Sequence, residues 1–365
     1  MTVPLTTGDL EIDLSCLVAN WNRLRSLAPG AEVAAMVKAD AYGLGADRIA
    51  PALAAAGCRE FFVADIGEGA SLRAVLPEAD IFVLSGALPG TDADLDAQRL
   101  VPVLNSRAQI DRWAARARRA ERVLPASIHC DTGMNRAGLD GADTAALLAD
   151  PTMLDGLQVR HVMSHLASAD DPDNAQNRRQ LDAFARLRAV LAEGRASLAN
   201  SAGLALGPAY HFDHVRPGVA LYGADPTPGN SLGVARVVTL HAPVVQVRRA
   251  ADRDTVGYSA THRVHGDRRL ATLAVGYGDG FSRAASNQGQ VAFEGHRAPI
   301  VGRVSMDLVT VDVTDVPEHV PVEEGSAAEL IGATITIDEV AAAADTIAYE
   351  VLTRLGRRYT RRYVG

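Results

Sequence analysis

The stretch VAAMVKADAYGLG, residues 33–45, sets the pattern from which the fold can be predicted. It begins with a short, continuous apolar run, VAAMV, and changes at Lys38 into a loop rich in small residues. Strands that are buried on both faces of a sheet have this apolar character, whereas half-exposed strands alternate between apolar and polar residues. The segment therefore predicts a buried strand followed by a polar loop.

Further runs of the same kind follow along the chain. They lie at 61–64 (FFVA), 81–84 (IFVL), 100–104 (LVPVL), 124–130 (LPASIHC), 157–163 (LQVRHVM), 196–200 (ASLAN) and 212–215 (FDHV). Segments rich in Ala, Leu and Arg with helical period separate most of them, for example 67–76, 106–120 and 174–193. Eight short strands that alternate with helices over about 200 residues fit a (β/α)8 barrel better than an open doubly wound sheet.

The two ends of the chain differ from this central part. Residues 10–28 carry apolar residues at helical spacing and predict an amphipathic helix. From residue 236 onward the apolar runs are rich in Val, Thr and Ile and are separated by Gly/Asp turns rather than long helices; they lie at 236–249, 270–275, 298–304 and 308–313. We therefore predict an α/β chain with a barrel domain at 1–235 and a mostly antiparallel β domain at 236–365. A helical stretch is expected at 338–356.

The composition excludes several classes of partner. Hydrophobic residues make up 48% and charged residues 22% of the 365 residues, the balance of an ordinary globular protein. The net charge of −8 comes without a basic tract, which argues against nucleic acid as a partner. No apolar run approaches the roughly 20 residues of a membrane span, and the N-terminus lacks the features of a signal peptide. The separated cysteines Cys16, Cys58 and Cys130 predict free thiols and a cytoplasmic location.

The chain contains a single lysine, Lys38, among its 36 basic residues. Codon bias in a GC-rich genome explains the replacement of other lysines by arginine. Arginine serves salt bridges and carboxylate binding as well as lysine does, but its guanidinium does not give up a proton to form an imine. Lysine does so once burial or a neighbouring cation lowers its pKa. The surviving lysine is therefore a candidate for covalent chemistry.

Polar residues follow the predicted strands at the positions where barrels carry their active sites, the C-terminal strand ends. These residues are Lys38, Arg136, Ser164, His165, Asn200, Ser201, Arg216 and Gly218. Each one alone fits a helix cap or a surface ion pair. Their joint position on one rim predicts an active site.

The segments around these residues resemble a known family. MVKADAYGLG (36–45) is similar to the cofactor-lysine signature of the alanine racemases, a barrel-type family of pyridoxal-phosphate enzymes. The resemblance continues in family order through DTGMNRAG (131–138), SHLASADDP (164–172), LANSAG (198–203), RPGVALYG (216–223), VGYSATH (256–262), VGYGDGFSR (275–283), VGRVSMD (301–307) and IAYEVLTRLGRRY (347–359). Together these motifs cover nearly the whole chain.

The resemblance implies a two-base racemisation of alanine that supplies D-alanine for peptidoglycan. Lys38 would hold pyridoxal 5′-phosphate as a Schiff base and then act as one base, and Tyr258 would act as the other. A racemase needs a base on each face of the substrate Cα. In the family this tyrosine comes from the partner subunit, so a homodimer with composite sites is expected. His165 matches a family position near the tyrosine and the cofactor.

The resemblance also assigns binding residues. Arg216 would face the pyridine nitrogen of the cofactor, where decarboxylases of the same barrel type carry an acid. Phosphate contacts would come from Tyr42, Ser201, Gly218, Val219 and Tyr349. Arg136 and Met306 would hold the substrate carboxylate, with Asp307 on the same wall, and Tyr277 and Asp170 would line the entrance. No metal site is expected.

The chain departs from the family at one position near the substrate arginine. Many relatives carry a carbamylated lysine two residues before the DTG motif, and here that residue is His129. Alternatives therefore stay open: a racemase of broader specificity that also acts on serine, or a non-catalytic cofactor-binding protein of the same barrel type. The second domain with Tyr258 argues against the latter, and Arg216 argues against a decarboxylase.

Overall fold

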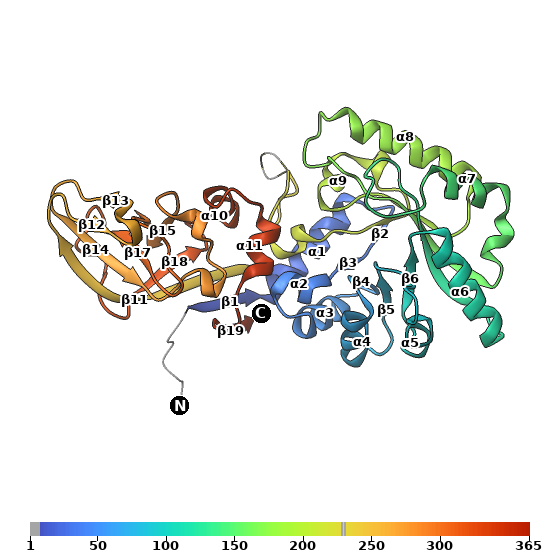
Figure 1. Cartoon of the computed structure of the whole chain (residues 1–365), viewed down its shortest axis with the longest axis horizontal. Coiled ribbons are helices and arrows are strands. Elements are labelled where there is room, and N and C mark those ends of the chain that lie inside the picture. Colours follow the sequence, from blue (N-terminus) through green and yellow to red (C-terminus); the bar gives the residue numbers. More distant parts are fainter. Residues whose placement is uncertain (1–7, 228, 230) are drawn as a thin grey trace. The chain divides into compact units, whose positions relative to one another are not determined.

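The computed structural model describes residues 8–227, 229 and 231–365, which form two compact units (Figure 1). The barrel unit contains residues 17–221 and the described residues of 225–234. The C-terminal unit contains the described residues up to Cys16, residues 222–224, and residues 235–365.

A parallel sheet forms the centre of the barrel unit. Its strands run in the order β2–β10–β9–β8–β7–β6–β5–β4–β3. Their bounds are β2 (Glu32–Val33), β3 (Ala35–Met36), β4 (Glu60–Val63), β5 (Asp80–Val83), β6 (Val101–Leu104), β7 (Leu124–His129), β8 (Leu157–Met163), β9 (Arg195–Ser197) and β10 (His214–Val215). The first predicted run is divided into β2 and β3, which pair with β10 and β4 respectively. At the break the amide of Ala34 donates to the carbonyl of Val215 at 3.1 Å. The predicted barrel is confirmed.

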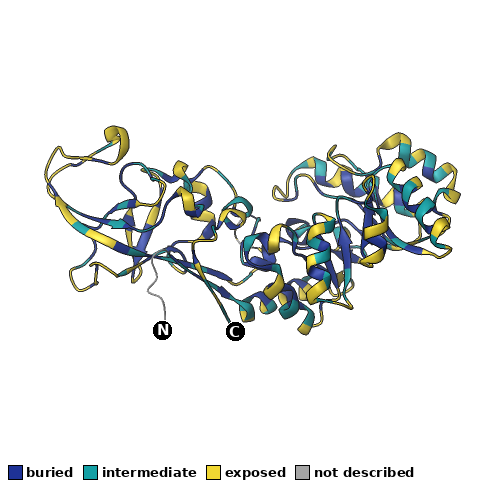
Figure 2. Ribbon diagram, turned by 60° about the horizontal axis from the view of Figure 1, so that its bottom comes forward, coloured by how far each residue is buried: buried dark blue, intermediate teal, exposed yellow. Residues whose placement is uncertain are grey.

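Helices surround this sheet, and their buried stripes face it (Figure 2). They are α1 (Leu14–Leu27), α2 (Lys38–Gly43), α3 (Ala46–Ala55), α4 (Ile66–Val75), α5 (Asp92–Ala97), α6 (Arg107–Ala120), α7 (Gly141–Ala149), α8 (Ala175–Val190) and α9 (Ser201–Ala205). Several begin at a residue whose side chain accepts a hydrogen bond from the first turn, such as Ser106 at α6 and Asn200 at α9. No helix of the described residues is long and apolar enough to cross a membrane.

The apolar strand runs form the core of the barrel unit. All four residues of β4 and of β6 are buried, as expected for strands with helices outside and packed side chains inside. Phe62 and Phe82 stack with their ring centroids 4.6 Å apart. The barrel is therefore filled, and its function is confined to the strand ends and the loops that follow them.

The C-terminal unit is a mostly antiparallel β domain, as predicted. Its strands are β1 (Asp9–Asp13), β11 (Val238–Ala250), β12 (Thr255–Val256), β13 (His262–Arg263), β14 (Arg268–Leu273), β15 (Gln290–Phe293), β16 (His296–Pro299), β17 (Val309–Asp312), β18 (Ala327–Ile331) and β19 (Thr360–Val364). The long strand β11 pairs antiparallel with β1, β14 and β18. The remaining helices are α10 (Ile337–Ala343) and α11 (Ala348–Arg354).

Two predicted helices are wrong in part. The helix expected at 10–28 begins at Leu14, because residues 9–13 form β1 between β11 and β19. Leu10 and Ile12 are buried with a period of two, a signal too short to compete with the helical pattern that follows. The stretch expected at 338–356 is broken between α10 and α11, where Asp345 has a φ of 51°. A left-handed residue ends a helix.

Candidate active site

Lys38 lies where the first barrel strand ends, at the start of an unusual turn. The four residues after it, Ala39–Tyr42, have φ values of 52°, 54°, 52° and 57°. This is a left-handed helical turn built without glycine, and each such residue costs about 1–2 kcal/mol. Strain of this kind persists only where the surrounding structure enforces it, and it is concentrated at functional sites. The turn fixes the direction in which the chain leaves Lys38.

Glu68 on α4 holds this turn in place. Its two carboxylate oxygens accept hydrogen bonds from the amides of Ala39 and Ala64, each at 2.8 Å. The carboxylate of Asp40 accepts from the amide of Ala46, also at 2.8 Å. The sequence analysis did not select Glu68. The only signal was its place three residues after the helix-capping Asp65, a spacing that indicates a helix start rather than a bridge to the lysine turn.

Positive charge is concentrated around Lys38. Burial lowers the pKa of the half-buried Lys38 ammonium, and the charge of Arg136 lowers it further, while Glu68 raises it. Burial also lowers the pKa of His165 well below its usual value, with further lowering by the charges of Arg216 and Arg136. His165 is therefore neutral, and a larger fraction of Lys38 is the free amine at neutral pH than for an exposed lysine.

Three of the predicted phosphate residues converge. The hydroxyl oxygen of Ser201 accepts hydrogen bonds from the amides of Gly218 at 2.8 Å and Ala220 at 3.3 Å. A Cβ atom on Gly218 would collide with the hydroxyl of the buried Tyr42. The neighbouring Val219 begins a 3-10 turn, Val219–Tyr222. Hydroxyl groups and closely approaching backbone amides form a cradle suited to a small anion.

We expect Gly218→Ala to weaken cofactor retention by at least about tenfold while the barrel stays folded. The added methyl group must displace the Tyr42 hydroxyl from the cradle, and a hydrogen bond to a charged group contributes about 1.5–3 kcal/mol. The measurement is the dissociation constant of pyridoxal phosphate from dialysed protein. Gly30→Ala, where a Cβ would meet nothing within 4 Å and the backbone is not left-handed, tests glycine replacement away from the cradle. Equal affinity of Gly218→Ala and wild type would argue against this phosphate site.

The loop that carries Arg136 is folded around Asp131. The carboxylate of Asp131 accepts hydrogen bonds from the amides of Gly133 and Met134 at 2.8 Å and of Asn135 at 2.7 Å. Asn135 takes a left-handed conformation, with a φ of 54°. Arg136 follows as an exposed residue whose charge reaches both Lys38 and His165. The aspartate of the DTG motif therefore shapes the loop and presents the arginine.

His129 at the end of β7 is held in one tautomer. The amide nitrogen of Asn105 donates to the carbonyls of Leu84 and Val103, so its oxygen must accept the proton of His129 Nδ1 at 2.7 Å. Burial lowers the pKa of His129 to about 4, helped by the charge of Arg216. The imidazole is neutral, and its Nε2 lone pair is left to accept a hydrogen bond.

Arg216, at the end of β10, lies in the barrel interior. Its guanidinium donates to the carbonyl of Ser164 at 2.6 Å and to the hydroxyl of Ser197. Burial lowers its pKa to about 9, which leaves it charged at neutral pH. The structure thus brings Lys38, His165 and Arg216 into one electrostatic environment in the barrel unit.

The other predicted site residues belong to the C-terminal unit. Tyr258 lies in the turn Tyr258–Ala260 and its side chain is 70% exposed, and Tyr277 and Met306 are also exposed. The amides of Tyr277 and Gly278 donate to the carbonyls of Ser305 and Met306, so these loops are joined. The Asp307 carboxylate accepts from Arg358 at 2.7 Å, and Tyr349 lies on α11.

The fold and the site define a class. A (β/α)8-type barrel with a lysine of lowered pKa after its first strand, a cluster of hydroxyl and amide groups on the same unit and a β domain at its C-terminus has the parts expected of a lysine-dependent barrel enzyme. The family follows from comparison with known proteins. Residues 12–226 match the alanine racemase N-terminal domain and residues 237–363 match the alanine racemase C-terminal domain. The chain belongs to the alanine racemase family, and the predicted resemblance is confirmed.

Individual relatives are similar over nearly the whole chain. The alanine racemase of Rhodospirillum rubrum is 48% identical over 361 residues, 98% of this chain and 96% of the relative. That of Acidiphilium cryptum is 49% identical over 352 residues, 96% and 97% of the two chains. The crystal structure of alanine racemase from Bartonella henselae with covalently bound pyridoxal phosphate matches with a TM-score of 0.93 at 40% identity, covering 98% of this chain and 99% of that one.

Proposed function

We propose that this protein is a pyridoxal-phosphate-dependent alanine racemase. The observation that carries the proposal is Lys38, the only lysine of the chain, half-buried and with its pKa lowered at the C-terminal end of the first barrel strand. An amine in this state is suited to covalent bonding with an aldehyde. The Bartonella relative, whose structure contains covalently bound pyridoxal phosphate, supports the assignment.

The residues around Lys38 fit the cofactor. Tyr42, Ser201 and the backbone of Gly218 and Val219 would hold its phosphate, because the cradle they form would be filled by any larger side chain at Gly218. Tyr349 would add a further contact. When bound, pyridoxal phosphate withdraws electrons from the substrate Cα and so makes the Cα proton removable.

Two side chains would move that proton. Lys38 would serve as the base on one face of the substrate Cα and Tyr258 as the base on the other. Cations lower a tyrosine pKa, and Lys38, Arg136 and Arg216 supply positive charge at the barrel end of the site. Since Tyr258 is 70% exposed and comes from a loop of the C-terminal unit, we propose that it reaches the lysine of a partner subunit. The working enzyme would then be a homodimer with composite sites.

Arg216 would direct the reaction toward racemisation. It stays charged and does not readily donate its proton, so a pyridine nitrogen facing it would stay unprotonated. The negative charge that develops would then be less delocalised into the ring, which favours return of a proton to Cα. An acid at this position would favour deeper delocalisation, as expected for a decarboxylase.

The substrate carboxylate would be bound at the mouth of the site. Arg136, presented by the Asp131 loop, would supply the charge, and the backbone of Met306 would supply a further contact. Asp307, paired with Arg358, would shape the same wall. Tyr277 and Asp170 would narrow the entrance for a small side chain such as methyl. We further propose a cytoplasmic role in supplying D-alanine for peptidoglycan, with Cys16, Cys58 and Cys130 unpaired.

Interconversion of L-alanine and D-alanine tests this function. Purified protein with added pyridoxal phosphate is expected to convert either L-alanine or D-alanine into an equal mixture of the two enantiomers. Chiral chromatography measures the composition of the mixture. Parallel reactions with L-serine measure the specificity, and we expect a higher kcat/KM for alanine. Absence of any interconversion of alanine by cofactor-loaded protein would contradict the proposal.

The activity is expected to be independent of bicarbonate. His129 stands where many relatives carry a carbamylated lysine, and the charge of Arg136 acts on it. We propose that the Nε2 lone pair, left free by the Nδ1 contact with Asn105, accepts from Arg136 without carbon dioxide. The measurement compares racemisation in degassed buffer and in buffer with added bicarbonate. His129→Lys supplies an amine that carbon dioxide can modify, and this variant is expected to gain a dependence on bicarbonate. Several-fold stimulation of the wild type would overturn the prediction.

A further inference from the structure

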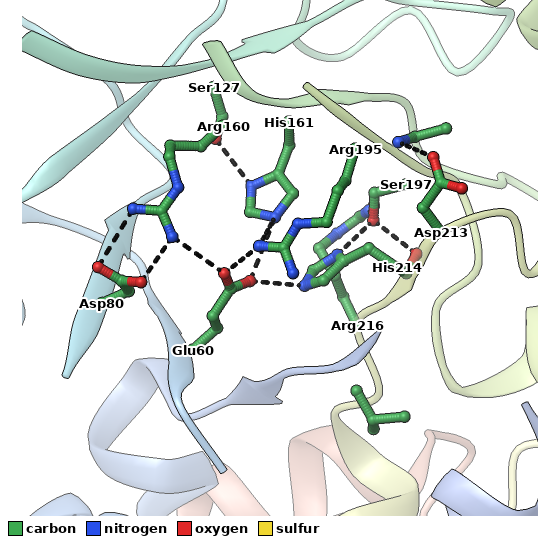
Figure 3. A network of polar contacts seen from close by, with 12 residues as sticks. Glu60, Asp80, Ser127, Arg160, His161, Arg195, Ser197, Asp213, His214 and Arg216 are labelled. Atoms are coloured by element: carbon green, nitrogen blue, oxygen red, sulfur yellow. Dashed lines mark hydrogen bonds and ion pairs between the residues drawn. The ribbon is translucent and has the colours of Figure 1, made fainter. Parts of the chain in front are cut away.

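A buried carboxylate occupies the interior of the barrel away from the lysine. Glu60, at the first residue of β4, is 3% exposed. Its Oε1 atom accepts hydrogen bonds from Arg195 and, at 3.3 Å, from Arg160, which also binds Asp80 at 2.6 Å (Figure 3). Burial raises the pKa of Glu60, but the contacts with His161 and His214 outweigh burial and hold that pKa far below its usual value, so the group is a carboxylate. None of these residues has a role in the proposed reaction.

Two buried imidazoles face the other oxygen of the same carboxylate. Nε2 of His214 lies 2.9 Å and Nε2 of His161 lies 3.2 Å from Glu60 Oε2. Such a trio resembles a set of metal ligands. However, Arg195 already contacts both Glu60 and His161, and the network includes the guanidiniums of Arg160 and Arg216. A divalent cation would add charge to a cluster whose carboxylates are already neutralised, so we assign no metal to the trio.

The ionised carboxylate determines where the proton of His214 lies. Burial lowers the pKa of His214 to about 3, and the imidazole is neutral with a single ring proton. A carboxylate only accepts, and Nε2 lies 2.9 Å from Glu60 Oε2, so we assign the proton to Nε2. The contact is not aligned as a hydrogen bond, and neither atom has another hydrogen-bond partner among the described residues. The Nδ1 atom is then a lone pair that accepts from the hydroxyl of Ser197 at 2.8 Å, a proton that Ser197 shares with the carbonyl of His214 at 2.9 Å.

The path of contacts from Glu60 ends at Arg216. With its own proton directed at His214, the Ser197 oxygen presents a lone pair, and Arg216 donates an N–H to it (Figure 3). Every group of this path is buried, from Glu60 through His214 and Ser197 to Arg216. A carboxylate 2.9 Å from an imidazole polarises the ring, and with it the hydrogen bonds beyond the ring, in a low-dielectric interior. The charge of Glu60 therefore strengthens the acceptor that holds Arg216.

We propose that Glu60 is a positioning residue for racemisation, acting through His214 and Ser197 to hold the guanidinium of Arg216 against the pyridine nitrogen of the cofactor. The inference rests on the proposed function, because it takes Arg216 to face that nitrogen. It adds a path of four side chains that begins at β4 and ends after β10, the two strands that flank the divided first strand. None of the motifs that place Arg216 contains Glu60.

Charged and titratable side chains of neighbouring strands surround this path. Glu60 is faced by His161 and Arg160 from β8, by Arg195 from β9 and by His214 from β10. The charge of Arg216 also acts on His129 and His165. Removing the negative charge of Glu60 makes the interior more positive. Ser197→Ala has the same effect at Arg216, because the guanidinium loses an acceptor that partly compensates its charge. In either variant a protonated group on the bound cofactor is less favoured, so its pKa should fall.

The test is a pH titration of the absorbance of the cofactor-loaded holoenzyme, without substrate, together with kcat for alanine. We expect Glu60→Gln and Ser197→Ala each to lower the pKa of the absorbance change by about one unit and kcat by about tenfold, the scale of one hydrogen bond to a charged group. The double variant should be no worse than either single variant, since both break the same path. Ser197→Ala keeps every charge of the cluster, so it decides the question even if Glu60→Gln does not fold.

Ser127→Ala is the matched control. Ser127 is fully buried in the same interior and contacts His161 at 3.1 Å, but it lies off the path to Arg216. It is expected to leave the titration and kcat unchanged, even if it lowers the melting temperature. Equal titration curves for Ser197→Ala, Ser127→Ala and a racemising wild type would overturn this inference alone. A wild type that neither binds the cofactor through Lys38 nor racemises alanine would overturn the proposed function instead.

Discussion

Lys38→Arg is expected to abolish alanine racemisation, with a loss of about 10⁴-fold or more in kcat. The variant keeps a positive charge at the strand end but removes the only side-chain amine of the chain. A guanidinium does not bond to an aldehyde carbon under these conditions. The same change removes one of the two proposed bases, so both the capture of the cofactor and the proton transfer are lost.

The readouts are borohydride reduction followed by intact mass, and racemisation of both enantiomers. Wild type is expected to gain one cofactor mass that maps to Lys38, and Lys38→Arg is expected to gain none. Circular dichroism checks that the fold is kept. Because the chain has no second lysine, no other side-chain amine can account for a label found in wild type. A Lys38→Arg enzyme with near wild-type turnover would refute the assignment.

Tyr258→Phe is expected to reduce racemisation by about 10²–10⁴-fold, the contribution of one general base. The loss must be equal in both directions, because the two alanine enantiomers have the same free energy in water. The base on the other face remains, however. In deuterated water one enantiomer should therefore still exchange its Cα proton with retention of configuration, which NMR and chiral chromatography detect.

Tyr277→Phe is the matched comparison, since Tyr277 is also an exposed tyrosine on a loop of the C-terminal unit. It is expected to change KM more than kcat, as a residue of the entrance would. Unaltered racemisation by Tyr258→Phe in both directions would show that another group is the second base.

Mixing the two inactive variants tests where Tyr258 acts. If each site combines Lys38 of one chain with Tyr258 of the other, a hybrid dimer of Lys38→Arg and Tyr258→Phe contains one intact site. Random reassembly of equal amounts then restores about one quarter of the wild-type activity. If both residues act within one chain, mixing restores nothing, and the proposal of composite sites fails.

Much of the barrel could be predicted because its strands are local signals. Runs such as FFVA at 61–64 and IFVL at 81–84 are buried on both faces, so each shows its apolar character without reference to its partners. The strand-end positions of Lys38 and Arg216 followed from the same pattern. The helix at 174–193 was predicted from its period and lies at Ala175–Val190.

The N-terminal strand could not be predicted in this way. Residues 9–13 form β1 because β11 and β19 lie on either side of it, and both come from the far end of the chain. Five residues carry too little periodicity to indicate a strand by themselves. The left-handed turn after Lys38 was hidden for a related reason, since alanine, aspartate and tyrosine do not favour positive φ. The carboxylate of Glu68, which comes from α4, anchors this turn, and the tertiary structure is needed to see it.

The sequence by itself determined the alternation of strands and helices in the barrel, the single amine and the motifs of the family, because these are properties of neighbouring residues. The tertiary structure decided the contacts that join Glu60 to Arg216 and the neutral tautomer of His129. These depend on burial and on hydrogen-bond partners far away in the chain, as with Glu60 and His214, and neither can be obtained from local composition.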